Sequence, residues 1–254
     1  MNRMVSQFSC GAASAVATKL TVVEYPDTVI VNAFLKEEHK DNRRFLLDCE
    51  RWFGRAIQVV CDERYGASTH EVWTRKRFIK GPRGAPCSGE LKRRVLGLLA
   101  QEGDVNIVGF TREEVDRFDD LCDHFPDKIW KAPLIERGLD KDDCLAMIER
   151  AGIELPMMYR LGYDNANCIG CPKGGQAYWQ NIRADFPDDF VQIQTIQESI
   201  GEGARFLQFR SGPRKGERMW LRELPLGRGD MRGEPSFSCS FFCQLAEQEI
   251  EGNT

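Results

Sequence analysis

The chain has 254 residues, of which 42% are hydrophobic and 29% charged, and its formal net charge is −4. This balance is typical of a globular protein with one large domain, and it excludes a chain that is basic throughout and coats nucleic acid. No apolar run approaches the ~20 residues that span a membrane, and the first residues lack a secretory signal. We therefore expect a cytoplasmic protein with no membrane partner. Its ten cysteines favour free thiols and metal ligands over disulfides.

Short apolar runs alternate with amphipathic runs through the first half of the chain. We expect strands at residues 5–8, 28–32, 57–60, 105–108 and 128–130, separated by helices at 12–23, 42–53 and 88–99 and by a helix that begins at Thr111. Thr111 and Glu114 have the spacing of a capping box. Strands and helices in alternation predict an α/β fold with a doubly wound, mostly parallel five-stranded sheet.

The pattern changes near Pro133, where the strands stop and glycine and cysteine become frequent. We expect an α/β domain over residues 1–133. Residues 134–254 are expected to form a helical and loop region, with helices at 140–151, 176–185 and 189–200.

The first predicted strand is followed by a turn of small residues: Ser9, Cys10, Gly11, Ala12, Ala13 and Ser14. Small residues let backbone N–H groups approach an anion closely, and the helix that follows adds the positive end of its dipole. Open α/β sheets also bind ligands at the carboxyl ends of their strands. The turn therefore predicts a phosphate site, and a tight turn without a ligand is the alternative interpretation.

This turn resembles the Ser-Gly-Gly-x-Asp-Ser pyrophosphate loop of PAPS reductases and N-type ATP pyrophosphatases. Ser9, Gly11 and Ser14 match, whereas Cys10 replaces the first glycine and Ala13 the aspartate. Further segments resemble the same superfamily, in the same order, over roughly residues 5–175. They are KEEHKDNRRFLLDCERWFG with His39, GAPCSGELKRRV with Cys87, Ser88 and Lys92, IVGFTREEVDR with Gly109, Thr111 and Glu114, and APLIERGLDKDDCLAMI.

The resemblance implies a fold that binds ATP or a related adenine nucleotide, with Mg²⁺ on its phosphates. It implies that residues 9–14, Gly109 and Thr111 contact the nucleotide. The candidates for catalytic roles are Ser14, His39, Cys87 and Lys92.

Two close cysteine pairs occur late in the chain. Cys168 and Cys171 form a C-x-x-C pair, and Cys239 and Cys243 form a C-x-x-x-C pair. Two such pairs brought together predict a tetrahedral four-thiolate metal site. The spacing suits a [4Fe-4S] cluster or a structural Zn²⁺, and Pro172 after the second cysteine favours the cluster.

Residues 74–94 hold eight lysines or arginines and one glutamate. This local positive charge predicts a phosphate-rich pocket or a surface for a nucleic-acid acceptor such as DNA or tRNA; a solvated basic loop is the alternative. The sequence leaves a homodimer open.

Three functions follow from these features. The first is an ATP pyrophosphatase that adenylates an acceptor for sulfur transfer, assisted by an iron–sulfur cluster. The second is a PAPS-reductase-type oxidoreductase, which needs a nucleophilic cysteine. The third is a nucleotide-sensing protein without catalysis.

Overall fold

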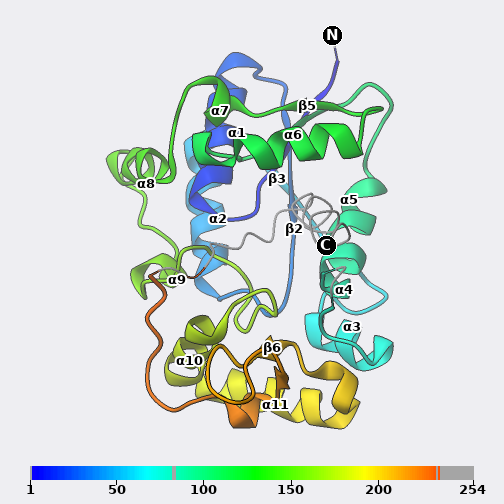
Figure 1. The fold of residues 1–254 in the computed structure, drawn as a ribbon. Coiled ribbons are helices and arrows are strands. Elements are labelled where there is room, and N and C mark those ends of the chain that lie inside the picture. Colours follow the sequence, from blue (N-terminus) through cyan, green and yellow to red (C-terminus); the bar gives the residue numbers. More distant parts are fainter. Residues whose placement is uncertain (1, 82–83, 233, 235–254) are drawn as a thin grey trace.

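Five strands form one parallel sheet in the computed structural model, which describes residues 2–81, 84–232 and 234. The strands are β1 (Met4–Gln7), β2 (Val29–Ala33), β3 (Ile57–Val60), β4 (Val105–Ile107) and β5 (Ile129–Lys131), in the order β3-β2-β1-β4-β5 (Figure 1). β1 is central, because its Ser6 lies beside Ile30 of β2 and Ile107 of β4. The predicted five-stranded parallel α/β fold is confirmed.

Helices lie on both sides of this sheet (Figure 1). On one side are α1 (Ala12–Glu24), α2 (Asp41–Phe53), α7 (Pro133–Glu136) and α8 (Lys141–Arg150). On the other are α3 (Thr69–Lys76), α4 (Pro86–Ser88) and α5 (Arg94–Gly97). The chain between β4 and β5 forms α6 (Val115–His124), preceded by the 3₁₀ turn Arg112–Glu114.

One predicted helix is divided in the structure, and the predicted capping box is present. The helix expected at 88–99 is divided into α4, a π-helical turn over Gly89–Arg93 and α5. A π turn inserts an extra residue into the helical ladder and is frequent at functional sites, and hydrophobic spacing does not reveal it. The capping box is present, since the Thr111 N–H donates to Glu114 Oε2 at 3.1 Å.

A first hydrophobic core fills the space between the sheet and α1, α2 and α8. Its members include Phe8, Val16, Ile30, Phe45 and Ile107, all at most 1% exposed. Each such side chain contributes about 1.5–3 kcal/mol on burial. Residues beyond Pro133 join this core, namely Leu134, Cys144 and Ile148.

A second core joins the C-terminal elements to the loops that leave the sheet. α10 (Gln176–Asp185), α11 (Pro187–Ile200) and the ribbon of β6 (Leu207–Gln208) and β7 (Arg218–Met219) gather at one end of the molecule (Figure 1, bottom). Their Trp179 and Ile193 pack in one cluster with Leu35, which follows β2, and with Trp73 of α3. The C-terminal region is therefore packed against the carboxyl edge of the sheet.

Across the described ranges, none of the helices has both the length and the apolar character needed to pass through a bilayer.

Candidate functional site

The strand order places a topological switch point beside β1. The chain leaves β1 toward β2 on one side, while β4 pairs with β1 on the other. Connections that diverge in this way leave a crevice at the carboxyl ends of the two strands, where open α/β sheets bind ligands. The residues at this crevice are 9–14, which follow β1, and 109–111, which follow β4.

The turn after β1 is held in shape by Ser14. Its hydroxyl donates to the Gly11 carbonyl at 2.9 Å and accepts from the Ser9 N–H at 3.2 Å and the Ser9 hydroxyl at 3.1 Å. These three bonds use the donor and both acceptor positions of the hydroxyl. The structure therefore gives Ser14, a candidate catalytic residue, a role in closing the turn.

Cys10 adopts a left-handed backbone conformation with φ of 57°. This conformation costs a residue other than glycine roughly 1–2 kcal/mol. The Cys10 side chain is 2% exposed. Burial raises the pKa of its thiol well above the ordinary value, and the Glu38 carboxylate raises it further. Cys10 is therefore a neutral packing residue, and its backbone shapes the turn.

The first turn of α1 presents its amides at this crevice. Gly11 is the N-cap, no acidic side chain lies in the first turn, and Ala13 stands where the resembling loops carry aspartate. One amide is engaged, because the Ala12 N–H donates to the Tyr159 hydroxyl at 3.1 Å. This helix end has the positive pole of the α1 dipole and no carboxylate in its own first turn, which suits an anion.

Gly109 and Thr111 lie at the same crevice with different roles. A Cβ on Gly109 would lie 2.8 Å from both N and Cα of Ser14, so the end of β4 touches the backbone of α1. Thr111 is buried, and its hydroxyl contacts the Glu114 carboxylate at 3.3 Å. Gly109 therefore fixes the depth of the crevice, and Thr111 begins the helical segment that follows.

A buried ion pair lies behind the turn. Lys92 Nζ of the π turn is 3.5 Å from Glu38 Oε1, and each side chain is 9% exposed. Glu38 also accepts a hydrogen bond from Asn42 Nδ2 at 3.3 Å. The charges of Glu38 and Lys92 both act on the buried Cys10 thiol, so this pair neighbours the turn.

The Cys168–Cys171 loop is attached to the chain that leaves β2. Cys168 forms an isolated antiparallel bridge with Glu38, and the Ile169 N–H donates to the Glu37 carbonyl at 2.8 Å. The Tyr178 hydroxyl donates to the Cys168 carbonyl and accepts from the Cys171 N–H, each at 3.0 Å. These contacts bring the cysteine pair to the same edge of the sheet as the turn of residues 9–14.

Cys87 lies at the cavity beside this pair. Cys87, Lys92, Cys168 and Cys171 line one pocket, together with Thr69 and four other residues. Both cysteines of the pair and Cys87 are buried. The tertiary structure thus unites two candidate catalytic residues with the first half of the predicted metal site.

The predicted four-cysteine site is not shown. Cys239 and Cys243 lie outside the described residues, and among the residues described no three His, Cys, Asp or Glu side chains are grouped so that they could hold a metal ion. Cys168 and Cys171 supply two thiols, which is half of a tetrahedral set.

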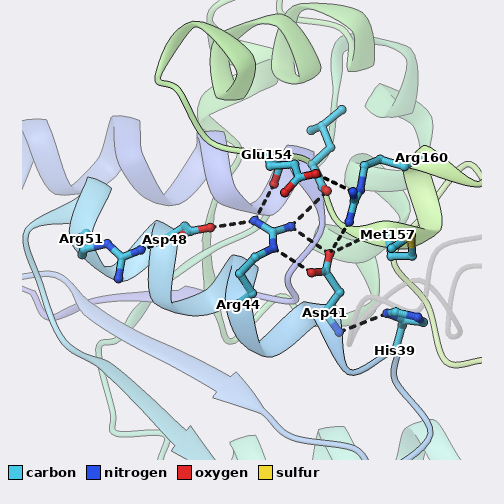
Figure 2. Close-up of polar contacts among 9 residues, drawn as sticks. His39, Asp41, Arg44, Asp48, Arg51, Glu154, Met157 and Arg160 are labelled. Atoms are coloured by element: carbon cyan, nitrogen blue, oxygen red, sulfur yellow. Dashed lines mark hydrogen bonds and ion pairs between the residues drawn. The ribbon is translucent and has the colours of Figure 1, made fainter.

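His39 lies at the start of α2. Its Nδ1 accepts the Asp41 N–H at 3.1 Å (Figure 2). Its ring meets the edge of the Phe186 ring, with the centroids 5.8 Å apart. Burial lowers the pKa of this imidazole. The geometry gives His39 the role of a helix cap with a neutral ring.

A charged network beside His39 holds α9 (Met157–Arg160). Asp41 binds Arg44 through both carboxylate oxygens, at 2.7 and 2.8 Å, and accepts the Met157 N–H at 2.8 Å (Figure 2). Arg160 approaches the same carboxylate at 3.5 Å. This network, with Tyr159 beside it, was missed from the sequence; the only local signal is Asp41 three residues before Arg44.

Residues 74–94 are less available to a nucleic acid than their composition indicates. Lys76 binds Glu90 at 2.5 Å, Arg94 binds Asp62, and Arg77 donates to the Ser199 and Ile200 carbonyls. Lys92 is paired with Glu38. Several of these cationic side chains therefore bind groups of the protein itself.

The fold and this edge define a parallel α/β protein with its candidate site at a switch point. Comparison with models of known protein families and with curated proteins finds no match for the chain.

Proposed function

We propose that this protein binds an adenine nucleotide through its phosphates at the switch point between β1 and β4. One observation carries the proposal: the small-residue turn 9–14 ends the central strand and begins α1 with no acidic side chain in its first turn. Backbone amides at such a helix end favour phosphate oxygens. Gly109 supports the proposal, since its lack of a side chain keeps β4 against the turn.

The chemistry we propose is cleavage of ATP at its α-phosphate. An oxygen of the acceptor would attack the α-phosphorus, the bond to pyrophosphate would break, and Mg²⁺ would balance the phosphate charge. Lys92 is a buried cation whose charge acts on Cys10 of the turn, and it would stabilise the departing pyrophosphate. The acceptor would be a nucleic acid, DNA or tRNA, activated for sulfur transfer.

Cys168 and Cys171 support a thiolate site beside that nucleotide. Both are buried, and the Cys168 loop is bridged to Glu38. With Cys239 and Cys243 they would hold a [4Fe-4S] cluster or a Zn²⁺. A cluster there would supply redox or sulfur-binding chemistry, and Cys87 lines the same small pocket as the cysteine pair.

A second candidate is nucleotide binding without turnover. Two features favour it. The Tyr159 hydroxyl occupies the Ala12 amide, and alanine at position 13 supplies no charged group for catalysis. The PAPS-reductase alternative depends on Cys87 as its nucleophile.

Calorimetric titration with ATP and PAPS tests the binding step. Gly11→Val would place a branched side chain over the amides and should abolish binding. Gly203→Val is the matched control, because no atom lies within 4 Å of a Cβ there, and it should bind as the wild type does. Retained affinity in Gly11→Val would move the pocket elsewhere.

Product analysis separates the alternatives. Release of pyrophosphate from ATP in the presence of tRNA or DNA supports the first chemistry, and thioredoxin-dependent release of sulfite from PAPS supports the reductase. Binding without either product supports the sensing protein.

A further inference from the structure

Tyr159 covers the phosphate turn with its hydroxyl. The Ala12 N–H donates to this oxygen at 3.1 Å, and the oxygen would lie 3.5 Å from a Cβ on Gly11. The contact joins positions 147 residues apart in the chain. A phenolic oxygen therefore occupies the place at the start of α1 where a bound anion would present one of its own oxygens.

The position of Tyr159 is set by α9, which is anchored independently of the turn. Asp41 accepts the Met157 N–H and contacts Arg160 (Figure 2). The start of α9 is thus held through the Met157 N–H, and neither this contact nor that of Arg160 involves the Tyr159 side chain. This arrangement suits a side chain that leaves its contact when another acceptor replaces it.

Burial raises the pKa of the Tyr159 hydroxyl to about 12, and the hydrogen bond from the Ala12 backbone opposes that rise. The hydroxyl is therefore neutral when it accepts the Ala12 N–H.

We infer that Tyr159 is a displaceable cap on the phosphate turn, and that an incoming phosphate group takes its place on the Ala12 amide. The inference rests on the proposed nucleotide site. In the unliganded protein the cap satisfies an amide that would otherwise be left unpaired. Since the ligand must replace this bond with its own, the cap lowers affinity.

Tyr159→Phe tests the inference, because it removes the hydroxyl and keeps the ring. We expect inorganic pyrophosphate and ATP to bind this variant roughly 2- to 10-fold more tightly than the wild type in calorimetric titrations, as expected for one lost hydrogen bond. Tyr163→Phe is the matched control: the Tyr163 hydroxyl donates to Asp185 at 2.9 Å, outside the turn, and this variant should keep wild-type affinity.

Amide hydrogen exchange gives a second readout that a purely structural tyrosine would not change. The Ala12 amide, which donates to Tyr159 in the wild type, should exchange faster in unliganded Tyr159→Phe, and pyrophosphate should slow its exchange in that variant. If the wild type binds ATP or pyrophosphate and folded Tyr159→Phe binds them equally or more weakly, Tyr159 is not a cap. The proposed nucleotide site would still stand. Failure of wild type and variant to bind either ligand overturns the nucleotide site, and the cap with it.

Discussion

Gly109 at the end of β4 and Ser14 in the first turn of α1 are in backbone contact, at a separation that admits no side chain. A Cβ on Gly109 would stand 2.8 Å from the Ser14 nitrogen, and the clash is with backbone, which cannot rotate away. The contact fixes how closely the two strands of the switch point approach the phosphate turn.

Gly109→Ala should destabilise the protein and distort the turn. The new methyl group must push the start of α1 away from β4, and overpacking of this kind lowers the free energy of unfolding by about 1–3 kcal/mol. Urea denaturation measures the loss, and ATP titration should show weakened binding. Gly97→Ala is the control, since a Cβ there has open space and alanine favours a helix; it should be neutral or stabilising. A Gly109→Ala variant with wild-type stability would contradict the contact.

Lys92→Met should lower the free energy of unfolding by about 3–5 kcal/mol, because it deprives the buried Glu38 carboxylate of its cation. The double variant Lys92→Met/Glu38→Gln should lose less than the two single variants combined. Urea denaturation of all four proteins gives the coupling free energy, which we expect at about 0.5–3 kcal/mol. Strictly additive losses would mean that the two side chains act independently.

His39→Asn separates capping from catalysis. The asparagine side chain can accept a backbone N–H at a helix start as His39 Nδ1 does, so stability at neutral pH should change by less than about 1 kcal/mol. Pyrophosphate release should persist if His39 only caps α2. A loss of turnover with unchanged stability would instead return His39 to the catalytic residues.

The same variant should alter the pH dependence of stability. Burial lowers the pKa of His39 below its ordinary value of 6.5, so the unfolded chain binds this proton more readily than the folded protein does. Its contribution to stability is full above pH 6.5 and falls as the pH drops through that value toward the folded pKa. Urea denaturation at a series of pH values between 7.5 and 5 measures this effect. The free energy of unfolding should fall less steeply with decreasing pH for His39→Asn than for the wild type.

Cys171→Ser should remove bound metal from protein purified without oxygen. Iron, sulfide and zinc analysis of the wild type distinguishes a cluster from zinc, and the variant should lose most of whichever is present, since a tetrahedral site needs all its thiolates. Cys61→Ser is the control because Cys61 is exposed at the end of β3. Equal metal content in wild type and Cys171→Ser would end the four-cysteine proposal.

The sheet strands were predictable because short apolar runs between turn residues report strands locally. α1 and α2 match their predicted ranges to within one residue, and the Thr111–Glu114 box is present as expected. α3 was missed, although Ser68 caps it by accepting from the Glu71 N–H at 3.3 Å. The break in the helix at Gly89–Arg93 was also missed, because one inserted residue hardly changes the hydrophobic pattern.

The sequence by itself determined the alternation of strands and helices, the small-residue turn and the C-x-x-C pair, because each depends on residues that are neighbours in the chain. Tertiary structure alone decided that Tyr159 meets Ala12, that the Cys168 loop is attached to Glu38, and that Gly109 lies against Ser14. Those contacts depend on strand order and on how the C-terminal region packs over the sheet edge, and both are settled by burial of the whole chain.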